Sequence, residues 1–581
     1  MLVYGVKVLQ FRTPVGNISP SQRASILAAN IEKSLRAGDV AVRKSGRNYQ
    51  VLLDGKLILT VTPWEAKQNR SSAQTLATEW ARNIRKAILT PPLKVATDPV
   101  RVPLGANRVI LASGTKFGAA TIATTDSSVL KVGKVGNGIA YKAIGYGKAQ
   151  VVVTAGSLVK HVSVNVLPMG ANLPSNLVAI VSGNPASEET VQGAIESAVR
   201  TQLGADPKAI LKIEFPKATQ VLPGESRTYT ARVRAVGPDV LPAEGPVFVN
   251  VKNLALGRKL ESALWYCNEP ENLQRPGLIF AAPLRPETPS RMLYHHINQM
   301  SSPLLVMVEA INHSELAAQL MVIPGDSKPD LNPVLAGVQA GDQFMKGWSL
   351  SSGEVITIPP KSRIPIAFRR ISTGQTMSGL CYLRLLDDGP DQIAIRTEAK
   401  NAYQLDARWT AASQSGTPWR HVNAQRINGS DIVTAMPSIH IYPNPYKVEE
   451  GVYQVGGKYA FFRIGEVPIA RADKLDKLSG NFGVTYTINA RMENPTAEAS
   501  KVEVVFEASA GYSGAVFYVN GQYIKTPLLQ PKTETQIAQY TLEPGASRNL
   551  SIVTVPLSGS SYPATLTIRP VDHTAQAHKL K

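Results

Sequence analysis

The chain has 581 residues, a length that predicts about four domains of roughly 150 residues each. Hydrophobic residues make up 44% and charged residues 18% of the sequence, which excludes a largely disordered or collagen-like protein. Lys and Arg total 62 against 43 Asp and Glu, and the net charge of +19 predicts an anionic partner.

Residues 1–93 are predicted to form an α+β domain. Ser19 and Pro20 are typical of an N-cap and a first helical position. Asp54-Gly55 favours a tight turn between two strands, and Pro91-Pro92 ends the domain. In chain order, the predicted elements are a strand over 6–11, a helix from 19, strands over 49–53 and 57–61, and a helix over 73–89.

Two stretches of this domain read ISPSQRASILAANIEKSL and DGKLILTVTPWEAKQNRSSAQTLATEWARNIRKAI. They resemble the extracytoplasmic domain that precedes the pore in some bacterial small-conductance mechanosensitive channels. The shared features are a Ser-Pro-x-x-Arg-Ala helix start, a strand ending in Thr-Val-Thr, and an acidic-Ala pair, here Glu65-Ala66. The resemblance covers residues 1–95 at most. It implies an envelope-facing context without channel activity, because no transmembrane segment follows.

Residues 94–170 are predicted to form a β domain, because short Val, Ile and Thr runs alternate with Gly about every ten residues. SSVLKV at 127–132 is followed by a Gly-rich hairpin leading to QVVVT at 150–154, and by VSVNV at 162–166. This order resembles the group 2 bacterial immunoglobulin-like domain, a family common in surface adhesins and cell-wall proteins. The Trp that usually precedes the Ser-Ser strand is absent, so an unrelated small sandwich is left open.

The rest of the chain is predicted to contain a helical connector and two larger β-sandwich domains. Ser187 caps the connector's helix, and Gly379–Leu385 is predicted to be the closing strand of the first sandwich. Asn520-Gly521 is a strong hairpin signal in the second. The fold class is therefore mainly β and multidomain, a small α+β N-terminal domain followed by several immunoglobulin-like β-sandwich domains. The predicted boundaries are 1–93 (α+β domain), 94–170 (immunoglobulin-like β domain), 171–208 (helical connector), 209–400 (β-sandwich), 401–445 (linker), 446–570 (β-sandwich) and 571–581 (tail).

Cys267 and Cys381 are the only cysteines, too few for a zinc knuckle or a scaffold of several disulfides. Two buried free thiols are the favoured interpretation, and one long-loop disulfide is left open. No run of 18 or more apolar residues occurs, so no transmembrane helix is predicted. The first ten residues show no signal peptide, which leaves open a cytoplasmic chain or a numbering that begins after a removed leader.

No catalytic, cofactor-binding or metal-binding residue is assigned, and no cofactor is predicted. A phosphate-binding loop ends in Gly-Lys-Ser or Gly-Lys-Thr, whereas Gly147-Lys148 is followed by Ala. The segment 511–514 lacks the spacing of a nucleophile elbow. His295 and His296 would point to opposite faces of one strand, so they are not expected to share a metal, and a surface or half-buried position is predicted.

Other polar and aromatic groups have structural interpretations. The segment 387–391, rich in Asp, resembles a calcium loop in composition only and is interpreted as a turn. Solvation or the helix dipole explains the pairs Glu188-Glu189 and Glu449-Glu450, and a glycosidase carboxylate pair is left open. Four tyrosines could line a glycan groove, although packing at a core edge is favoured. They are Tyr442, Tyr446, Tyr453 and Tyr459.

These observations predict a non-enzymatic, extracytoplasmic bacterial envelope or surface protein with a structural or binding role. Residues 1–170 hold 23 Lys and Arg against 7 Asp and Glu, which is +16 of the net +19. The predicted partner is therefore an anionic cell-wall polymer or membrane surface that binds these residues. Nucleic acid is not predicted, because no nucleic-acid-binding motif occurs. The alternatives, in order, are a self-assembling filament or surface-layer subunit, a virion surface protein, and a secreted glycan-active enzyme.

Overall fold

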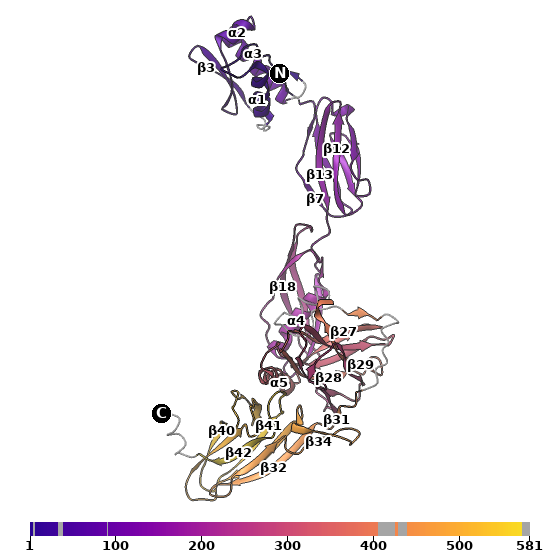
Figure 1. The fold of residues 1–581 in the computed structure, drawn as a ribbon, viewed down its shortest axis with the longest axis vertical. Coiled ribbons are helices and arrows are strands. Elements are labelled where there is room, and N and C mark those ends of the chain that lie inside the picture. Colours follow the sequence, from indigo (N-terminus) through magenta and orange to yellow (C-terminus); the bar gives the residue numbers. More distant parts are fainter. Residues whose placement is uncertain (4–5, 33–38, 90, 405–423, 428–437, 572–581) are drawn as a thin grey trace. The chain divides into compact units, whose positions relative to one another are not determined.

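The computed structural model describes residues 1–581 except 4–5, 33–38, 90, 405–423, 428–437 and 572–581 (Figure 1). Strands dominate and helices are few, which confirms the predicted fold class of a mainly β, multidomain chain with a small α+β part at the N-terminus. The chain divides into two compact units. The first comprises Met1–Asn172, Ala205–Leu211 and Ala235–Ala243, and the second comprises the remaining residues.

The first unit begins with the predicted α+β domain. Its elements are β1 (Leu2–Val3), β2 (Val6–Lys7), α1 (Pro20–Glu32), β3 (Val40–Ser45), β4 (Asn48–Leu53), β5 (Lys56–Val61), α2 (Pro63–Gln68) and α3 (Ala73–Leu89). Asp54 and Gly55 both have positive φ between β4 and β5, which confirms the predicted tight turn. α3 buries Leu76, Trp80 and Ile84 against the sheet β3-β4-β5. The predicted strand over 6–11 is shorter than expected, and α2 was not predicted.

Residues 94–166 form a two-sheet sandwich in which one sheet has the order β10-β11-β8-β6 and the other the order β7-β13-β12-β9. The strands are antiparallel except for the parallel pair β13 and β7. Alternate residues of β12, such as Val151 and Val153, are fully buried between the sheets. The strands are β6 (Lys94–Val95), β7 (Val100–Val102), β8 (Asn107–Ser113), β9 (Thr121–Thr124), β10 (Leu130–Val135), β11 (Gly138–Ala143), β12 (Gly147–Ala155) and β13 (Leu158–Val166).

The largest sheet has 11 strands, ten of them in the order β17-β18-β19-β15-β26-β25-β28-β23-β20-β31, while β21 pairs with β23. A 5-stranded sheet with the order β22-β29-β24-β27-β30 packs against part of it through a core that includes Trp265, Leu284 and Ile395. The bounds are β14 (Ala171–Asn172), β15 (Asn176–Ser182), α4 (Glu188–Gln202), β16 (Gly204–Ala205), β17 (Ile210–Glu214), β18 (Ser226–Val236), β19 (Ala243–Asn253), β20 (Ala263–Cys267), β21 (Asn272–Leu273), β22 (Gly277–Leu284), β23 (Ser290–Asn298), β24 (Leu304–Asn312), β25 (Ala318–Ile323), α5 (Pro333–Ser349), β26 (Gly353–Ile358), β27 (Ser362–Ile371), β28 (Thr376–Leu385), β29 (Ile393–Asn401), β30 (Gln425–Arg426) and β31 (Ile441–Pro443).

Three sequence predictions are wrong in this region. The segment 171–208 is not only a helical connector, because its strand β15 lies inside the large sheet, parallel to β19 and antiparallel to β26. The strand 379–385 does not close a sandwich, since β28 lies between β25 and β23 and is buried along its whole length. The predicted linker 401–445 contributes β30 and β31 to the two sheets, although much of it lies outside the described residues.

The C-terminal sandwich has one sheet with the order β32-β36-β41-β38-β39 and another with the order β33-β42-β37-β40. Asn520 and Gly521 both have positive φ between β38 and β39, as the hairpin signal predicts. The predicted tail lies almost entirely outside the described residues. The strands of the two sheets are β32 (Tyr446–Gln454), β33 (Ala460–Ile464), β36 (Thr485–Glu493), β37 (Ser500–Glu507), β38 (Val516–Val519), β39 (Gln522–Lys525), β40 (Glu534–Leu542), β41 (Ser547–Thr554) and β42 (Ala564–Pro570). β34 (Ile469–Ala470) and β35 (Lys477–Leu478) form a separate two-stranded antiparallel sheet.

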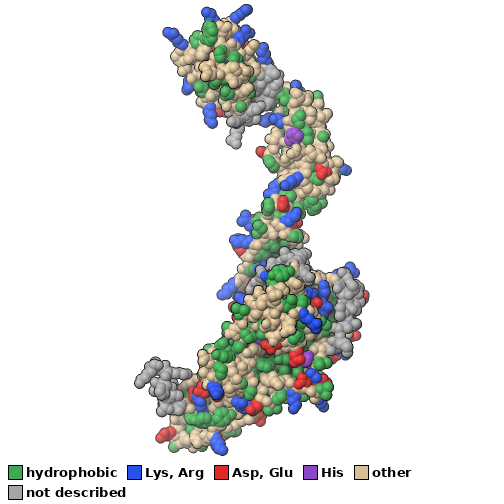
Figure 2. Space-filling model, in the orientation of Figure 1, with side chains coloured by type: hydrophobic (Ala, Val, Ile, Leu, Met, Phe, Trp, Pro, Cys, Tyr) green, Lys and Arg blue, Asp and Glu red, His purple; other side chains and the backbone are tan. Residues whose placement is uncertain are grey.

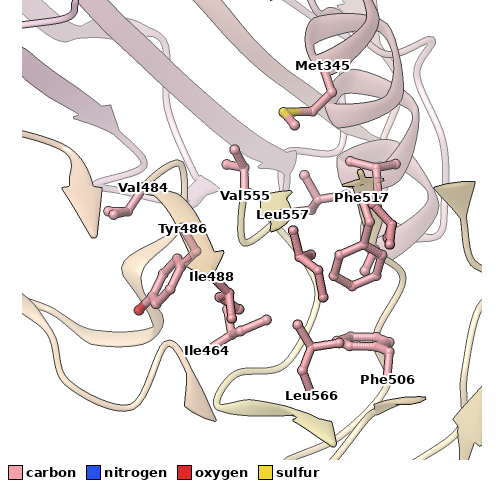
Figure 3. Packing of buried hydrophobic residues seen from close by; sticks show 14 of the residues in the cluster. Met345, Ile464, Val484, Tyr486, Ile488, Phe506, Phe517, Val555, Leu557 and Leu566 are labelled. Atoms are coloured by element: carbon pink, nitrogen blue, oxygen red, sulfur yellow. The ribbon is translucent and has the colours of Figure 1, made fainter. Parts of the chain in front are cut away.

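The core of the C-terminal sandwich is continuous with the packing around α5 (Figure 3). Phe506 and Phe517 meet edge to face inside the sandwich, with ring centroids 5.2 Å apart. On α5, Gly341 lies so close to Leu557 that a Cβ at this glycine would come within 2.2 Å of a Leu557 methyl carbon. The missing side chain therefore lets the sandwich approach the helix backbone directly.

A buried polar cluster also joins the C-terminal sandwich to the rest of the second unit. Arg291 on β23 is fully buried and bonds Glu261 through Nε at 3.1 Å and Nη2 at 2.7 Å. Its Nη1 donates to the Gly483 carbonyl oxygen and to Thr485 Oγ1, both at 2.7 Å. Glu261 accepts a further bond from the Trp348 indole at 3.0 Å. Buried charges are stable only when they are paired and hydrogen-bonded. Separation of the C-terminal sandwich from the rest of the second unit would break these bonds, so the cluster holds the two parts together.

Candidate functional site

The strongest candidate surface is the positive charge of residues 1–170. Within it, the hairpin between β3 and β4 gathers Arg43, Lys44 and Arg47, which are all exposed. The turn works because Gly46 adopts a φ of +61°, as Gly does at the first central position of many two-residue hairpins. Arg43 is oriented by two bonds to Gln50 Oε1, the shorter at 2.8 Å. This basic hairpin, residues 43–47, presents three cations to solvent.

Few carboxylates compensate this charge. Among the described residues of 1–170, the ion pairs join Arg23 to Glu65 at 2.6 Å and Arg85 to Asp39 at 2.5 Å. Figure 2 shows Lys and Arg side chains projecting from the N-terminal part of the chain, with few Asp or Glu among them. Exposed charges with little compensation create a positive potential that attracts anions and decays with ionic strength.

Glu65, the acidic residue of the acidic-Ala pair, lies inside the α+β domain rather than on its surface. Its carboxylate accepts bonds from the Arg12 backbone N–H at 2.7 Å, Thr13 Oγ1 at 2.5 Å and Arg23 Nη1 at 2.6 Å. Burial alone would raise the pKa of Glu65, but these hydrogen bonds and the Arg23 charge lower it below the usual value. Glu65 thus ties the segment before α1 to α2, which is a structural role.

His295 and His296 are buried, so the prediction of a surface or half-buried position is wrong. Both lie on β23, where the large sheet is covered on both faces. Burial, with the neighbouring His296, lowers the pKa of His295 to about 3, and burial lowers the pKa of His296 to about 4 although the Pro270 carbonyl raises it. Within the described part of the chain, no group of three or more His, Cys, Asp or Glu side chains could hold a metal ion.

The two cysteines are free and buried, as the favoured interpretation predicts. Cys267 is on β20 and Cys381 is on β28, and β23 lies between these strands. Two strand spacings amount to about 9.6 Å, which exceeds the Cα separation of roughly 7 Å that a disulfide tolerates. Burial raises the pKa of Cys267 to about 12 and raises that of Cys381 as well, so neither is an activated nucleophile.

The tyrosines, the Glu188-Glu189 pair and the Asp-rich segment 387–391 make contacts within the fold. Tyr442 and Tyr453 are buried, and Tyr446 bonds Glu261, so the four tyrosines do not share one exposed groove. Glu188 and Glu189 lie in the first turn of α4, which Ser187 caps, as the sequence predicts. Asp387 forms an ion pair with Lys259 at 3.7 Å.

Surface hollows lined by described residues of the second unit include three of several hundred cubic ångströms. One of about 290 Å³ at the start of α4 is lined by hydroxyl groups that bond each other, such as Ser352 Oγ and Thr190 Oγ1 at 2.8 Å. One of about 480 Å³ lies between α4 and strands β15 and β26, with lining residues that include Val178 and Ala198. The third, of about 490 Å³, lies over β17, β18 and β19 and carries charges of both signs.

No helix in the described part of the chain combines the length and the apolar character needed to span a bilayer. The sequence analysis located the positive charge in residues 1–170 but did not single out Arg43, Lys44 and Arg47, which flank the β3–β4 turn. The basic Arg-Lys-Ser-Gly-Arg stretch around this turn was nevertheless visible in the sequence as a local signal.

Comparison with known families and structures gives one partial match to a family. A family model described as "Domain of unknown function (DUF8459)" matches residues 1–90. No curated protein matches the sequence. Similar solved structures include a chimeric titin Z1Z2 tandem (9% identity, TM-score 0.12), domains 5–6 of the S-layer protein SbsC (15%, 0.13) and human protocadherin-24 EC1-2 (14%, 0.13). Each match covers 28% of this chain, and 100%, 97% and 98% of those chains respectively. All three TM-scores are far below 0.5.

Proposed function

We propose that the protein is a non-enzymatic component of the bacterial cell envelope or surface, in which residues 1–170 bind an anionic polymer or a membrane surface. The observation that carries this proposal is the distribution of charge. Residues 1–170 hold +16, whereas the 39 Lys and Arg of residues 171–581 nearly balance 36 Asp and Glu. Binding to anions therefore belongs to the N-terminal region.

The rest of the described chain supports a structural role. The histidine and cysteine side chains with strongly shifted pKa values, His295, His296, Cys267 and Cys381, are buried within strands of the large sheet. Candidate catalytic groups normally combine a shifted pKa with access to substrate. The polar cluster around Arg291 and the close approach at Gly341 make the second unit a firmly packed body.

The chemistry recognised is the phosphate or carboxylate group, which both lipid headgroups and wall polymers carry. Arg presents a planar fork to such groups, and Lys adds a compact charge. Each cation near an anionic membrane contributes about 1 kcal/mol to binding, so Arg43, Lys44 and Arg47 together contribute about 3 kcal/mol at low salt. We therefore expect R43Q/K44Q/R47Q to weaken binding of the full chain by about 100-fold at low salt.

The test is sedimentation of the full chain with vesicles of neutral lipid alone or with about one third phosphatidylglycerol, and, separately, retention on immobilised polyphosphate. The matched control is K458Q/K477Q/K501Q, which removes three exposed lysines from the C-terminal sandwich. We expect binding to anionic vesicles or polyphosphate that falls with salt and with the hairpin variant but not with the control. Equal loss in both variants would refute a localised surface, and binding to neither material would refute the proposal.

A further inference from the structure

β17 is an edge strand of the 11-stranded sheet, no strand of the described residues pairs with its outer edge, and its side chains alternate between two faces. Lys212 and Glu214 lie on the face of the 490 Å³ hollow, whereas Leu211, Ile213 and Phe215 alternate onto the opposite face. On that opposite face, Arg200 of α4 stacks over the Phe215 ring at 5.1 Å. The edge therefore carries one apolar row and one row in which the exposed Ile210 is followed by the charged Lys212 and Glu214.

The apolar row of β17 is only partly covered. Leu211 is 41% exposed, and Ile213 and Phe215 are partly exposed. The neighbouring strand β18, in contrast, buries Tyr229, Ala231 and Val233 on its core side. The apolar face of the sheet therefore extends as far as the edge strand β17, where its side chains are only partly covered. A further strand beside β17 would remove the apolar row from water and satisfy the unpaired backbone groups of the edge.

Exposed edge strands are often protected from pairing by Pro, by bulges, by shortness or by charged side chains. β17 is short and carries Lys212 and Glu214, but its sequence Ile-Leu-Lys-Ile-Glu has neither Pro nor Gly. The edge strand β32 makes an instructive contrast because it also exposes apolar residues, Val448 and Val452. In the antiparallel register that would bring these two valines opposite each other between two copies, Glu450 would face its own copy, which is repulsive.

We propose that two copies of this chain associate by antiparallel pairing of their β17 strands, with Ile213 at the two-fold axis. In this register Lys212 of each copy lies opposite Glu214 of the other, so these charged residues form two complementary cross-strand pairs. On the other face, Leu211 lies opposite Phe215 and Ile213 opposite itself, so the apolar row is continuous across the junction. The same segment matches itself on both faces, as an isologous interface requires.

The charge pattern selects the partner. Within one copy, Lys212 Nζ lies 3.2 Å from Glu214 Oε1, and both side chains are largely exposed. An unrelated strand could add to the edge through backbone bonds alone, but only a strand with the same cation and anion spacing matches both positions. A second copy of this chain supplies that spacing by symmetry. Pairing through β17 does not require anion binding by residues 1–170.

The experiment is sedimentation equilibrium of the full chain from about 1 to 200 µM. We expect a monomer–dimer equilibrium without larger species, because a two-fold interface closes on itself. K212E and E214K each replace two attractive cross-strand pairs by two repulsive ones, so each variant alone is expected to weaken dimerisation tenfold or more. R491E is the matched control, because Arg491 also precedes a paired Glu by two residues, on the internal strand β36.

A mixture of the two single variants provides the decisive measurement. In a mixed dimer, the K212E strand offers only carboxylates to the E214K strand, which offers only amines, so attraction returns at both positions. We therefore expect the equimolar mixture, and also the double swap K212E/E214K alone, to dimerise as the native chain does. A monomeric native chain up to 200 µM, open-ended polymers, or failure of the mixture to recover dimerisation would each overturn the proposal.

Discussion

Arg291→Met tests whether the buried polar cluster holds the C-terminal sandwich to the rest of the second unit. The native guanidinium is fully buried and makes two bonds to Glu261 and two to groups of the sandwich, Gly483 and Thr485. Met fills part of the volume but leaves the Glu261 carboxylate buried without its cation. Removing one partner of a buried pair costs about 3–5 kcal/mol, and we expect this range for R291M.

The assay is differential scanning calorimetry of the full chain. Melting entropy is about 2.1 cal/mol/K per residue, so in a cooperative unit of roughly 390 residues each kcal/mol lowers Tm by about 1.2 °C. R291M is therefore expected to lower the transition of the second unit by about 4–6 °C. The control Arg491→Met removes an arginine whose side chain is 57% exposed on β36, and should shift Tm by less than about 1 °C.

The double variant E261Q/R291M separates loss of charge from loss of packing. If an uncompensated carboxylate causes most of the damage, neutralising Glu261 in the R291M background should recover at least about 1 kcal/mol. A double variant as unstable as R291M would show that shape alone matters. An R291M transition within about 1 °C of the native one would refute the reasoning altogether.

Three further predictions concern buried or strained positions. Cys267 and Cys381 should not react with a thiol reagent in the native chain and should both react in urea, whereas reaction of either in the fold would contradict their burial. In the folded chain the pKa values of His295 and His296 are about 3 and about 4, whereas an unfolded chain has a His pKa of about 6.5. In acid, both histidines therefore take up protons when the chain unfolds. Stability should therefore fall by about 2–3 kcal/mol per His between pH 7 and 4.5, and an unchanged urea midpoint would contradict this. Gly521→Ala should cost about 1 kcal/mol in urea unfolding, since φ is +81° there, and a neutral effect would contradict it.

Local signals in the sequence predicted local structure. The turns at Asp54-Gly55 and Asn520-Gly521 and the helix over 73–89 need only neighbouring residues for their definition, and each is present. The pairing of strand β15 could not be predicted from such local signals. Its seven residues alternate in burial as a strand should, but its neighbours β19 and β26 lie far away in sequence. Pairing over such distances depends on the whole sheet, so the segment was interpreted as part of a connector.

The same limit applies to side-chain roles. Arg291 bonds Gly483 and Thr485, which are 192 and 194 positions away in sequence, and no local pattern marks it as different from an exposed arginine. His295 and His296 were predicted to lie at the surface or half-buried, yet both are buried, because the large sheet is covered on both faces at β23. Composition thus predicted where net charge accumulates, but not which charges the fold buries.

Salt separates the two kinds of electrostatic contact that this chain offers. The cations of residues 1–170 act at a distance and are mostly uncompensated, so raising ionic strength from 0.05 to 0.5 M should remove most anion binding. The Lys212 and Glu214 pairs have no net charge and operate at contact, beside an apolar row and backbone bonds that salt does not screen. Dimerisation through β17 should therefore weaken only several-fold over the same range. If salt abolished both together, the association of two copies would depend on the basic N-terminal surface and not on the edge strand.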